Sequence, residues 1–294
     1  MRIVVTGSGG QVGGALLASL AGLGEIVALD RARLNLADDD GIRTALRELQ
    51  PALIINAAAY TAVDAAESDA ATAFRINADA PRVLAEEAER LGAPLIHYST
   101  DYVFDGSKDG PWLEDDVPAP LSVYGRSKLA GEQAIAEVGG VHLILRCSWV
   151  YGLTGKNFLL TMLKLADTRD ALSIVDDQIG APTWSRTIAD ATAGIIRHTS
   201  EPAQLAAHTG VYHLCAGGQT SWFGFAQAIF AHPAVTRRPA LHPIPTAGYP
   251  TPATRPANSR LNTDKFRRTF GDLPAWDDAL AECLQLRSEL NTKA

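Results

Sequence analysis

Cysteine and long apolar runs are scarce in this chain. Its three cysteines lie far apart and form no Cys-x-x-Cys pair, so neither a disulfide framework nor a structural zinc site is expected. No stretch reaches the roughly 18 consecutive apolar residues that a membrane span requires. The sequence begins with a strand that runs into glycines rather than with a signal peptide. We therefore expect a cytoplasmic protein with no membrane partner.

Positive charge is also in short supply. The 294 residues include 26 lysines and arginines against 33 aspartates and glutamates, which gives a formal net charge of −7. Proteins that bind nucleic acids need clustered lysine and arginine to neutralise phosphates, so no nucleic-acid partner is expected. Hydrophobic residues make up 47% of the chain and charged residues 20%, which is typical of a globular protein. The length favours two domains, or one domain with a substantial addition.

The first half of the chain alternates short apolar runs with alanine-rich amphipathic segments. The apolar runs predict strands at 2–7, 25–30, 52–58, 94–100 and 142–150. The segments between them predict helices at 13–23, 41–49, 68–91 and 124–137. This alternation is typical of a parallel sheet that is flanked by helices and buried on both faces. We therefore expect a Rossmann-type doubly wound α/β fold, with an NAD(P)-binding domain over residues 1–150.

The second half, residues 151–294, lacks the regular alternation of the first half and predicts a smaller mixed α/β substrate-binding domain. The sequence predicts helices at 158–166 and 187–197, a strand at 172–177 and an amphipathic closing helix at 277–290. A proline-rich region at 233–256 predicts loops. Later segments can return to the first domain, so the sequence places the boundary only loosely.

The first strand leads into a G-x-x-G-x-x-G pattern built on Gly7, Gly10 and Gly13, with Gln11 and Val12 between the last two. Glycines let the backbone turn tightly and approach a pyrophosphate, and a helix N-terminus offers free N–H groups and the positive end of the helix dipole. The pattern follows a strand and opens a helix, which favours a dinucleotide site over a purely structural turn.

The residues after the second strand bear on the choice between NADH and NADPH. Asp30 ends this strand at about the distance expected of an acid that binds the adenosine ribose, which favours NAD. Arg31 and Arg33 follow, and either could accept the extra phosphate of NADP. The sequence predicts NADPH or NADH and leaves the preference open.

The third strand ends in Ala57, Ala58 and Ala59, and Tyr60 and Thr61 follow. Ligands of open α/β sheets bind at the carboxyl ends of the strands, where small side chains leave room for a ribose or a nicotinamide. A run of small residues also occurs in ordinary core packing. Its position at a strand end favours cofactor contact for these five residues.

Tyr124 and Lys128 lie four residues apart in a predicted helix, so both side chains emerge on one face. Such a pair is most often solvent-exposed, but Thr100 and Asp101 leave the fourth strand at the same edge of the sheet. A hydroxyl, a tyrosine and a lysine over a nicotinamide suit carbonyl reduction. Tyr124 would protonate the oxygen, Thr100 would hydrogen-bond it, and Lys128 would orient the ribose and lower the pKa of the tyrosine.

Four motifs together resemble those of the extended short-chain dehydrogenase/reductase family. They are T-G-x-x-G-x-x-G, N-A-A-A, S-T-D-Y-V-F-D-G and Y-G-x-x-K. Longer stretches that span almost the whole chain resemble one branch of this family, whose members reduce the 4-keto group of a dTDP-linked deoxysugar. These stretches are NAAAYTAVDAAE, SVYGRSKLAGE, RCSWVYG, DDQIGAPT and YPTPATRPANSRLNT. The resemblance implies an NAD(P)H-dependent oxidoreductase with a dTDP-sugar substrate.

The resemblance also implies roles for single residues. It makes Tyr124 the proton donor, Lys128 its partner and Thr100 a fine-tuning hydroxyl. It assigns cofactor contacts to Gly10, Gln11, Val12, Asp30, Ala59, Tyr60 and Thr61. It assigns sugar-nucleotide contacts to Thr100, Asp101 and Trp149.

Two of the candidate substrate residues have ordinary alternatives. Trp149 follows the last strand of the first half and could pack its indole against the deoxysugar, although a tryptophan there could equally belong to the core. Arg255 lies in the proline-rich region and could pair with the substrate diphosphate, whereas the alternative is a solvated surface arginine.

The chain departs from the family pattern at several positions. Family members that dimerise around magnesium carry a glutamate where this chain has Ala15, so we predict no metal site and no magnesium-bridged dimer, but a monomer or a weak homodimer. Asn35 replaces a common acid, and Thr254 replaces the first of two arginines. Cys147 stands where threonine is usual, and its apolar strand predicts a buried, inert thiol.

Besides another sugar-nucleotide 4-reductase of the same family, three alternative functions share parts of this pattern. Sugar-nucleotide 4,6-dehydratases place a glutamate after Thr-Asp, where this chain has Tyr102, so the acid that eliminates water is missing. Sugar-nucleotide 4-epimerases share the glycine and Tyr-Lys motifs, and only the closer match to the reductases disfavours them. A non-catalytic nucleotide-binding subunit would typically lose the tyrosine, the lysine or the glycines, all of which this chain keeps.

Overall fold

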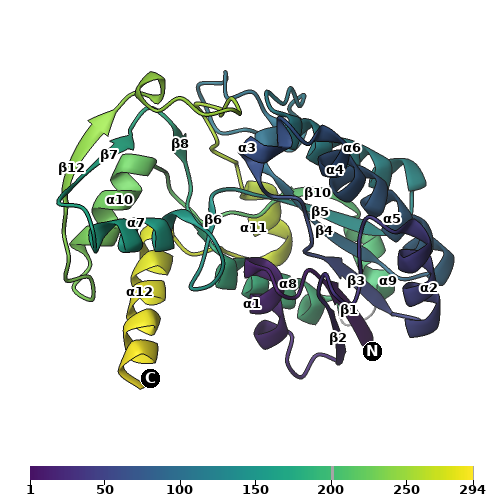
Figure 1. The fold of residues 1–294 in the computed structure, drawn as a ribbon. Helices are drawn as coiled ribbons and strands as arrows, with labels where there is room; N and C mark the ends of the chain where they lie inside the picture. Colours follow the sequence, from purple (N-terminus) through teal and green to yellow (C-terminus); the bar gives the residue numbers. More distant parts are fainter. Residues whose placement is uncertain (200–201, 294) are drawn as a thin grey trace.

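The centre of the protein is a six-stranded parallel sheet with the strand order β10-β5-β4-β3-β1-β2 (Figure 1). The structure is a computed structural model that describes residues 1–199 and 202–293. The strands of the sheet are β1 (Arg2–Thr6), β2 (Glu25–Leu29), β3 (Leu53–Asn56), β4 (Leu95–Thr100), β5 (His142–Cys147) and β10 (Gly210–His213). The strand order reverses between β1 and β3, and ligands of doubly wound sheets bind in the crevice at such a reversal. The predicted Rossmann-type fold is confirmed.

Helices cover both faces of this sheet. Alternate residues of each strand point to opposite faces, and apolar residues on both faces are buried by packing against helices. One face packs against α1 (Gln11–Ser19), α8 (Ser185–His198) and α11 (Asp264–Phe270). The other face packs against α2 (Asp39–Leu49), α5 (Ala80–Leu91) and α6 (Val123–Val138). In β1, Ile3 and Val5 belong to the first of these cores and Val4 to the second. The apolar strands of the sequence are thus buried on both sides, as predicted.

The predicted helices are present, with two differences. The segment predicted as one helix at 68–91 consists of α4 (Ala70–Phe74), the π-helical turn η1 (Arg75–Asp79) and α5. The first helix begins earlier than predicted, at Gln11, and ends at Ser19. A turn follows it, in which Gly22 has a φ of +83° that favours glycine.

A second lobe lies beside the sheet and is built from the later part of the chain (Figure 1). It contains α7 (Phe158–Ala166), β7 (Ala171–Val175), α10 (Trp222–Ala231), β12 (Ala240–Ile244) and α12 (Trp276–Lys293). β12 pairs in parallel with β7, although it lies in the region predicted as loops, so this prediction is wrong for 240–244. A strand with one neighbour tolerates a proline such as Pro243. The proline favoured a loop in the sequence, which is why the strand was not predicted.

Other segments after residue 150 return to the large sheet. β10 pairs with β5 at the edge of the sheet, and α8 and α11 pack on its face. The smaller elements are η2 (Asp101–Val103), α3 (Val63–Ala66), β6 (Val150–Tyr151), β8 (Ile179–Gly180), β9 (Thr183–Trp184), α9 (Pro202–Leu205), η3 (Ala206–His208), β11 (Thr220–Ser221) and η4 (Thr246–Gly248). In the described ranges no helix has the length and apolarity needed to cross a bilayer.

Candidate active site

The glycine pattern lies at the crevice between β1 and β3. Gly7 follows β1 with a φ of +65°, and a Cβ on it would lie 2.7 Å from the Cα of Ala58. A Cβ on Gly13 would collide with the carbonyl oxygen of Gly7. Gly10 is the N-cap of α1, and within the described ranges no side chain caps this end of the helix. The N–H groups of the first turn can therefore bind an anionic group such as a pyrophosphate.

The side chains of the two residues after Gly10 face the protein itself. Gln11 Oε1 accepts a hydrogen bond of 2.8 Å from Asn157 Nδ2, at the N-terminus of α7 in the second lobe. Val12 packs against the core of the large sheet. A contact of Val12 with the cofactor would therefore use the backbone, whereas the Gln11 side chain has only its oxygen engaged by the described residues.

Asp30 lies beside the glycine turn, at the end of β2. A Cβ on Gly9 would be 4.0 Å from the Cβ of Asp30. One carboxylate oxygen of Asp30 accepts hydrogen bonds of 3.0 Å from the backbone N–H groups of Ala32 and Arg33. The guanidinium of Arg33 donates to the carbonyl oxygen of Ala28. These bonds fix the loop after β2 with the exposed Asp30 at its start.

The segment from Ala57 to Thr61 follows β3 and borders the same crevice. Its backbone is held by Asn77, which the sequence analysis did not single out. Asn77 Oδ1 accepts from the N–H of Tyr60 at 2.8 Å, and Asn77 Nδ2 donates to the carbonyl oxygen of Tyr60 at 3.0 Å. The signal in the sequence was an asparagine within an alanine-rich segment, and the structure shows that it lies in the turn η1.

Thr100, Tyr124 and Lys128 come together where β4 ends and α6 begins. Ser122 caps α6 by accepting from the N–H of Gly125, which starts the helix at the residue before Tyr124. A side chain at Gly125 would collide with the carbonyl oxygen of Tyr102. The glycine of the Y-G-x-x-K motif therefore lets α6 approach the end of β4 closely.

Burial and hydrogen bonds set the electrostatics of these three residues. Burial raises the pKa of Tyr124, and a hydrogen bond with Thr100 acts in the opposite direction. Lys128 is 2% exposed, and its Nζ donates to the carbonyl oxygen of Tyr98 at 2.7 Å. Burial lowers the pKa of Lys128 to about 8. The lowering of the tyrosine pKa by Lys128 stays a prediction, since the net shift of Tyr124 is upward.

Asp101 is a buried carboxyl group next to Thr100. Thr100 Oγ1 donates to Asp101 Oδ1 at 3.1 Å, whereas Asp101 Oδ2 has no partner among the residues that the structure describes. Burial raises the pKa of Asp101 to about 6, against hydrogen bonds with Ser259 and Thr100 that lower it. Asp101 is therefore mostly ionised at neutral pH, with one oxygen free to accept a hydrogen bond.

Trp149 has an unusual backbone conformation and an aromatic neighbour. Its φ of +47° lies in the region that favours glycine, and its ring stacks on Trp222 with 3.6 Å between the ring centroids. Trp222 Nε1 donates to Gln178 Oε1 at 3.1 Å. A Cβ on Gly180 would lie 2.6 Å from the Trp149 ring. Trp149 is only 9% exposed, so most of the side chain is covered by protein and little of the ring is left for a sugar.

Arg255 is paired rather than free on the surface. Its guanidinium forms two hydrogen bonds with the carboxylate of Asp64, of 2.9 and 3.1 Å. Asp64 lies in α3, after β3, whereas Arg255 belongs to the chain that follows η4. The hydrogen bond from Arg255 is the largest cause that lowers the pKa of Asp64. This ion pair ties the two segments together.

Few residues in the described ranges could bind a metal ion or act as a reactive thiol. Over residues 1–199 and 202–293 no group of three or more His, Cys, Asp and Glu residues is placed to hold a metal ion. Cys147, Cys215 and Cys283 are free and buried. Burial raises the pKa of each thiol, which agrees with the predicted inert character of Cys147.

Comparison with known proteins gives matches over nearly the full chain. The family described as "RmlD substrate binding domain" matches residues 1–288. A dTDP-4-dehydrorhamnose reductase of Burkholderia thailandensis is 48% identical over 295 residues, which cover 97% of this chain and 98% of that protein. The dTDP-4-dehydrorhamnose reductase of Escherichia coli K12 is 46% identical over 285 residues, with 94% of each chain covered.

A solved structure is similar over the same range. The crystal structure of a dTDP-4-dehydrorhamnose reductase of Bacillus anthracis in complex with NADP superimposes with a TM-score of 0.90 and 33% sequence identity. The match covers 97% of this chain and 99% of that one. The similarity therefore includes both the large sheet and the second lobe.

Proposed function

Because the chain belongs to the family of dTDP-4-dehydrorhamnose reductases, NADP-dependent oxidoreductases, we propose that it reduces the C4 keto group of dTDP-4-dehydro-6-deoxy-L-mannose. The product of this reaction is dTDP-L-rhamnose, and the reductant is NADPH or NADH. The observation that carries the proposal is the position of Thr100, Tyr124 and Lys128 beside the glycine crevice, in a chain that is 48% identical to such an enzyme over nearly its whole length.

The crevice between β1 and β3 fits a dinucleotide. Gly7 and Gly13 leave space that any Cβ would fill, and the first turn of α1 offers its N–H groups to the pyrophosphate. Asp30 would bind the adenosine ribose, and Ala57, Ala58, Ala59, Tyr60 and Thr61 would line the nicotinamide side. When bound, the reduced nicotinamide supplies the hydride that adds to C4.

Tyr124 is proposed as the proton donor to the sugar oxygen. Its raised pKa keeps the phenol protonated at neutral pH, which is the form that a donor needs. The Thr100 hydroxyl would hydrogen-bond the same oxygen as negative charge develops on it, for which its single proton must leave Asp101 Oδ1. Lys128 would orient the nicotinamide ribose, and its ammonium form would lower the pKa of Tyr124 as the proton leaves.

Three further residues are proposed to bind the sugar nucleotide. The free oxygen of Asp101 can accept a hydrogen bond from a sugar hydroxyl. The small exposed part of Trp149, which is 9% exposed in all, would pack against the deoxysugar. Arg255 would pair with the diphosphate, for which it must exchange the carboxylate of Asp64 for a phosphate.

Incubation of the protein with NADPH and dTDP-4-dehydrorhamnose tests the proposed function. We expect NADPH to be consumed in proportion to the dTDP-L-rhamnose formed, and a parallel assay with NADH gives the cofactor preference. If NADPH is not consumed while a nucleotide-hexose is converted without net redox, the protein is a 4-epimerase. If it binds NADPH but converts neither substrate, it is a non-catalytic subunit.

A further inference from the structure

A line of polar side chains crosses the interior of the large sheet on the face that α6 covers. Thr6, Asn56 and His97 are direct neighbours in the parallel registers of β1, β3 and β4. Neighbours in register point to the same face of a sheet. Their exposed fractions are 1%, 1% and 0%. Polar groups buried to this extent nearly always have hydrogen-bond partners, and here the neighbours in register bond to one another.

The direction of the hydrogen bonds in this line is fixed by a backbone amide. Asn56 Oδ1 accepts from the Thr6 hydroxyl at 2.6 Å and from the N–H of Ala58 at 3.3 Å. Because a backbone N–H can only donate, the oxygen of the Asn56 amide faces Ala58 and its nitrogen faces His97. Asn56 Nδ2 lies 2.9 Å from His97 Nδ1. His97 Nδ1 therefore accepts a hydrogen bond and carries no proton.

The state of the imidazole follows from its surroundings. Burial is the largest cause that holds the pKa of His97 well below its usual value, so the ring is neutral. A neutral ring has one N–H, and with Nδ1 accepting it lies on Nε2. Nε2 is 3.2 Å from Lys128 Nζ. An N–H donor at this position requires a lone pair on Nζ, which only the neutral amine has.

We propose that His97 is a positioning residue that holds Lys128 by donating from Nε2 to Nζ, and that it thereby favours the neutral amine of Lys128 before the cofactor binds. The carbonyl oxygen of Tyr98 is the second partner of Nζ and accepts from the amine at 2.7 Å. The role rests on the proposed function, because Lys128 acts there on the cofactor ribose and on Tyr124. The protonation states of His97 and Lys128 in the free protein do not depend on which substrate the protein reduces.

The other groups around Lys128 act in the opposite direction. Glu132 on α6 and Cys147 on β5 raise the pKa of Lys128, but burial outweighs them and the pKa is about 8. The carboxylate of Glu132 is engaged by Arg146, with an ion pair of 2.6 Å between two buried side chains. The amine and the ammonium of Lys128 are thus equally populated at about pH 8. A single hydrogen-bond donor such as His97 can decide between them.

NMR of the full-length protein labelled with ¹⁵N at its histidines tests the tautomer. We expect His97 to carry its proton on Nε2, and His97→Gln identifies its signals by their loss. His213 serves as the internal reference, because its Nδ1 lies 3.1 Å from the carbonyl oxygen of Asn262 and must donate, which gives the opposite tautomer. A proton on Nδ1 of His97, alone or together with one on Nε2, would overturn the proposal whatever the protein reduces.

Two substitutions of His97 test the positioning role through kinetics. His97→Gln keeps an N–H donor at the position of Nε2, whereas the side chain of His97→Asn reaches only the position of Nδ1. We expect the glutamine variant to keep kcat within about three-fold and the asparagine variant to lose on the order of 10- to 100-fold, because Lys128 is no longer held in place. Thermal unfolding of both variants gives their stability, so that loss of fold is separated from loss of position.

The pH dependence of kcat/KM for NADPH distinguishes a positioning role of His97 from a purely structural one, because loss of packing alone would not shift the pKa of the alkaline limb. In the wild type we expect kcat/KM to fall as Lys128 loses its proton, with a pKa of about 8. In His97→Asn this alkaline limb moves to higher pH, since the donor that disfavours the ammonium is gone. Equal kcat and equal alkaline limbs in the two variants would show that His97 only fills space. If the wild type consumes no NADPH, the proposed function fails while the NMR result still stands.

Discussion

At the residue scale, the phenol of Tyr124 is the group whose removal most directly separates chemistry from binding. We predict that Tyr124→Phe lowers turnover by at least about 100-fold, as expected for the loss of a general acid. The dissociation constant of NADPH should change little, because the ring and its edge-on contact with Tyr102 remain. Steady-state NADPH oxidation and a fluorescence titration with NADPH measure the two quantities.

Tyr212→Phe is the matched control for this substitution. Tyr212 is a buried tyrosine of β10 at the edge of the sheet, and its hydroxyl bonds to Thr269 rather than to the site. The control should cost about 1 kcal/mol of stability and leave turnover unaffected. Turnover of Tyr124→Phe at the rate of the wild type would remove Tyr124 from the mechanism.

The sequence singled out those residues of the candidate site that belong together in a motif. It did not single out residues that stand outside such a combination. Tyr124 and Lys128 stand out through their helical spacing and their position after the glycine pattern. Asn56 ends β3 and His97 lies within β4, and only the strand register shows that they meet. The sequence shows both polar residues, but it does not show that they are partners.

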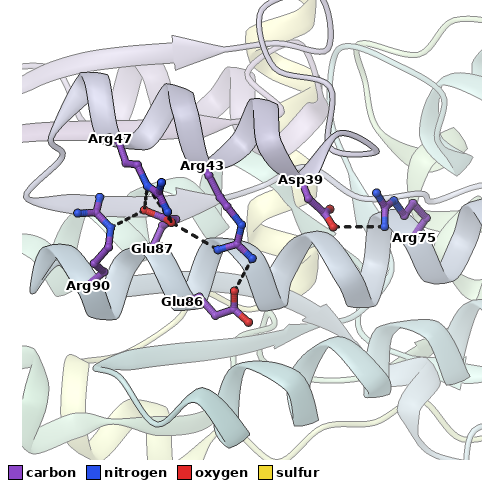
Figure 2. A network of polar contacts seen from close by, with 7 residues as sticks. All are labelled: Asp39, Arg43, Arg47, Arg75, Glu86, Glu87 and Arg90. Carbon is purple, nitrogen blue, oxygen red and sulfur yellow. Dashed lines mark hydrogen bonds and ion pairs between the residues drawn. The ribbon is translucent and has the colours of Figure 1, made fainter.

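At the scale of elements, one buried carboxylate joins α2 to α5 (Figure 2). The side chain of Glu87 on α5 is 2% exposed and forms ion pairs with Arg47 at 2.6 Å, Arg90 at 2.7 Å and Arg43 at 3.4 Å. Hydrogen bonding from Arg47 is the largest cause that holds the pKa of Glu87 down, at about 2. Glu86 contacts only Arg43 in Figure 2 and is far more exposed.

We predict that Glu87→Gln lowers the free energy of unfolding at pH 7 by on the order of 2 kcal/mol, a value discounted because the arginines are partly solvated. The folded pKa of Glu87 lies below its usual value of 4.5, so this stability is present above pH 4.5 and is lost as the pH falls through about 2. Urea denaturation at several pH values measures the difference between wild type and variant, which should shrink below pH 4.5.

Glu86→Gln is the neighbouring control for this prediction, since it removes an equal charge from the same helix. It breaks one partly exposed ion pair with Arg43 and should cost less than about 1 kcal/mol. If the two variants were equally destabilised at pH 7, burial of Glu87 between arginines would not be the reason for its contribution.

Elements with strong periodicity were predictable, and elements fixed by distant partners were not. α6 and α7 lie within one residue of their predicted bounds because caps at Ser122 and Asn157 define their starts. β10 and β12 are short, and each pairs with a single neighbour. The strand β12 even contains Pro243. Neither segment has a local pattern that requires a strand, so tertiary pairing decides both.

At the scale of the whole molecule, the two lobes are joined through both ends of the candidate site. Gln11, at the start of α1, bonds to Asn157 at the start of α7. Arg255 bonds to Asp64 at the other end. The sequence assigned Gln11 and Arg255 to ligands, because it cannot show that a side chain also bridges two parts of the fold. A substrate diphosphate that takes Arg255 would therefore loosen one of these links.

The surface of α1 around Ala15 bears on how the protein assembles. Ala15 lies one turn before Ser19 on α1 and packs against the core of the sheet, so it offers no oxygen to a metal. Ser19 bonds to Asp190, whose carboxylate also pairs with Arg186 at 3.5 Å. The acid close to this face of α1 is thus engaged by a cation of the protein itself, which disfavours magnesium there.

We therefore predict that the protein is a monomer or a weak homodimer whose assembly does not depend on magnesium. Sedimentation equilibrium in magnesium chloride and in EDTA should give the same average mass at each protein concentration, and any dimer should dissociate on dilution in both. The melting temperature should likewise be the same in the two buffers, because no divalent ion binds the folded state preferentially. A dimer that forms only with magnesium would contradict the argument from Ala15 and would place oxygen ligands elsewhere on this surface.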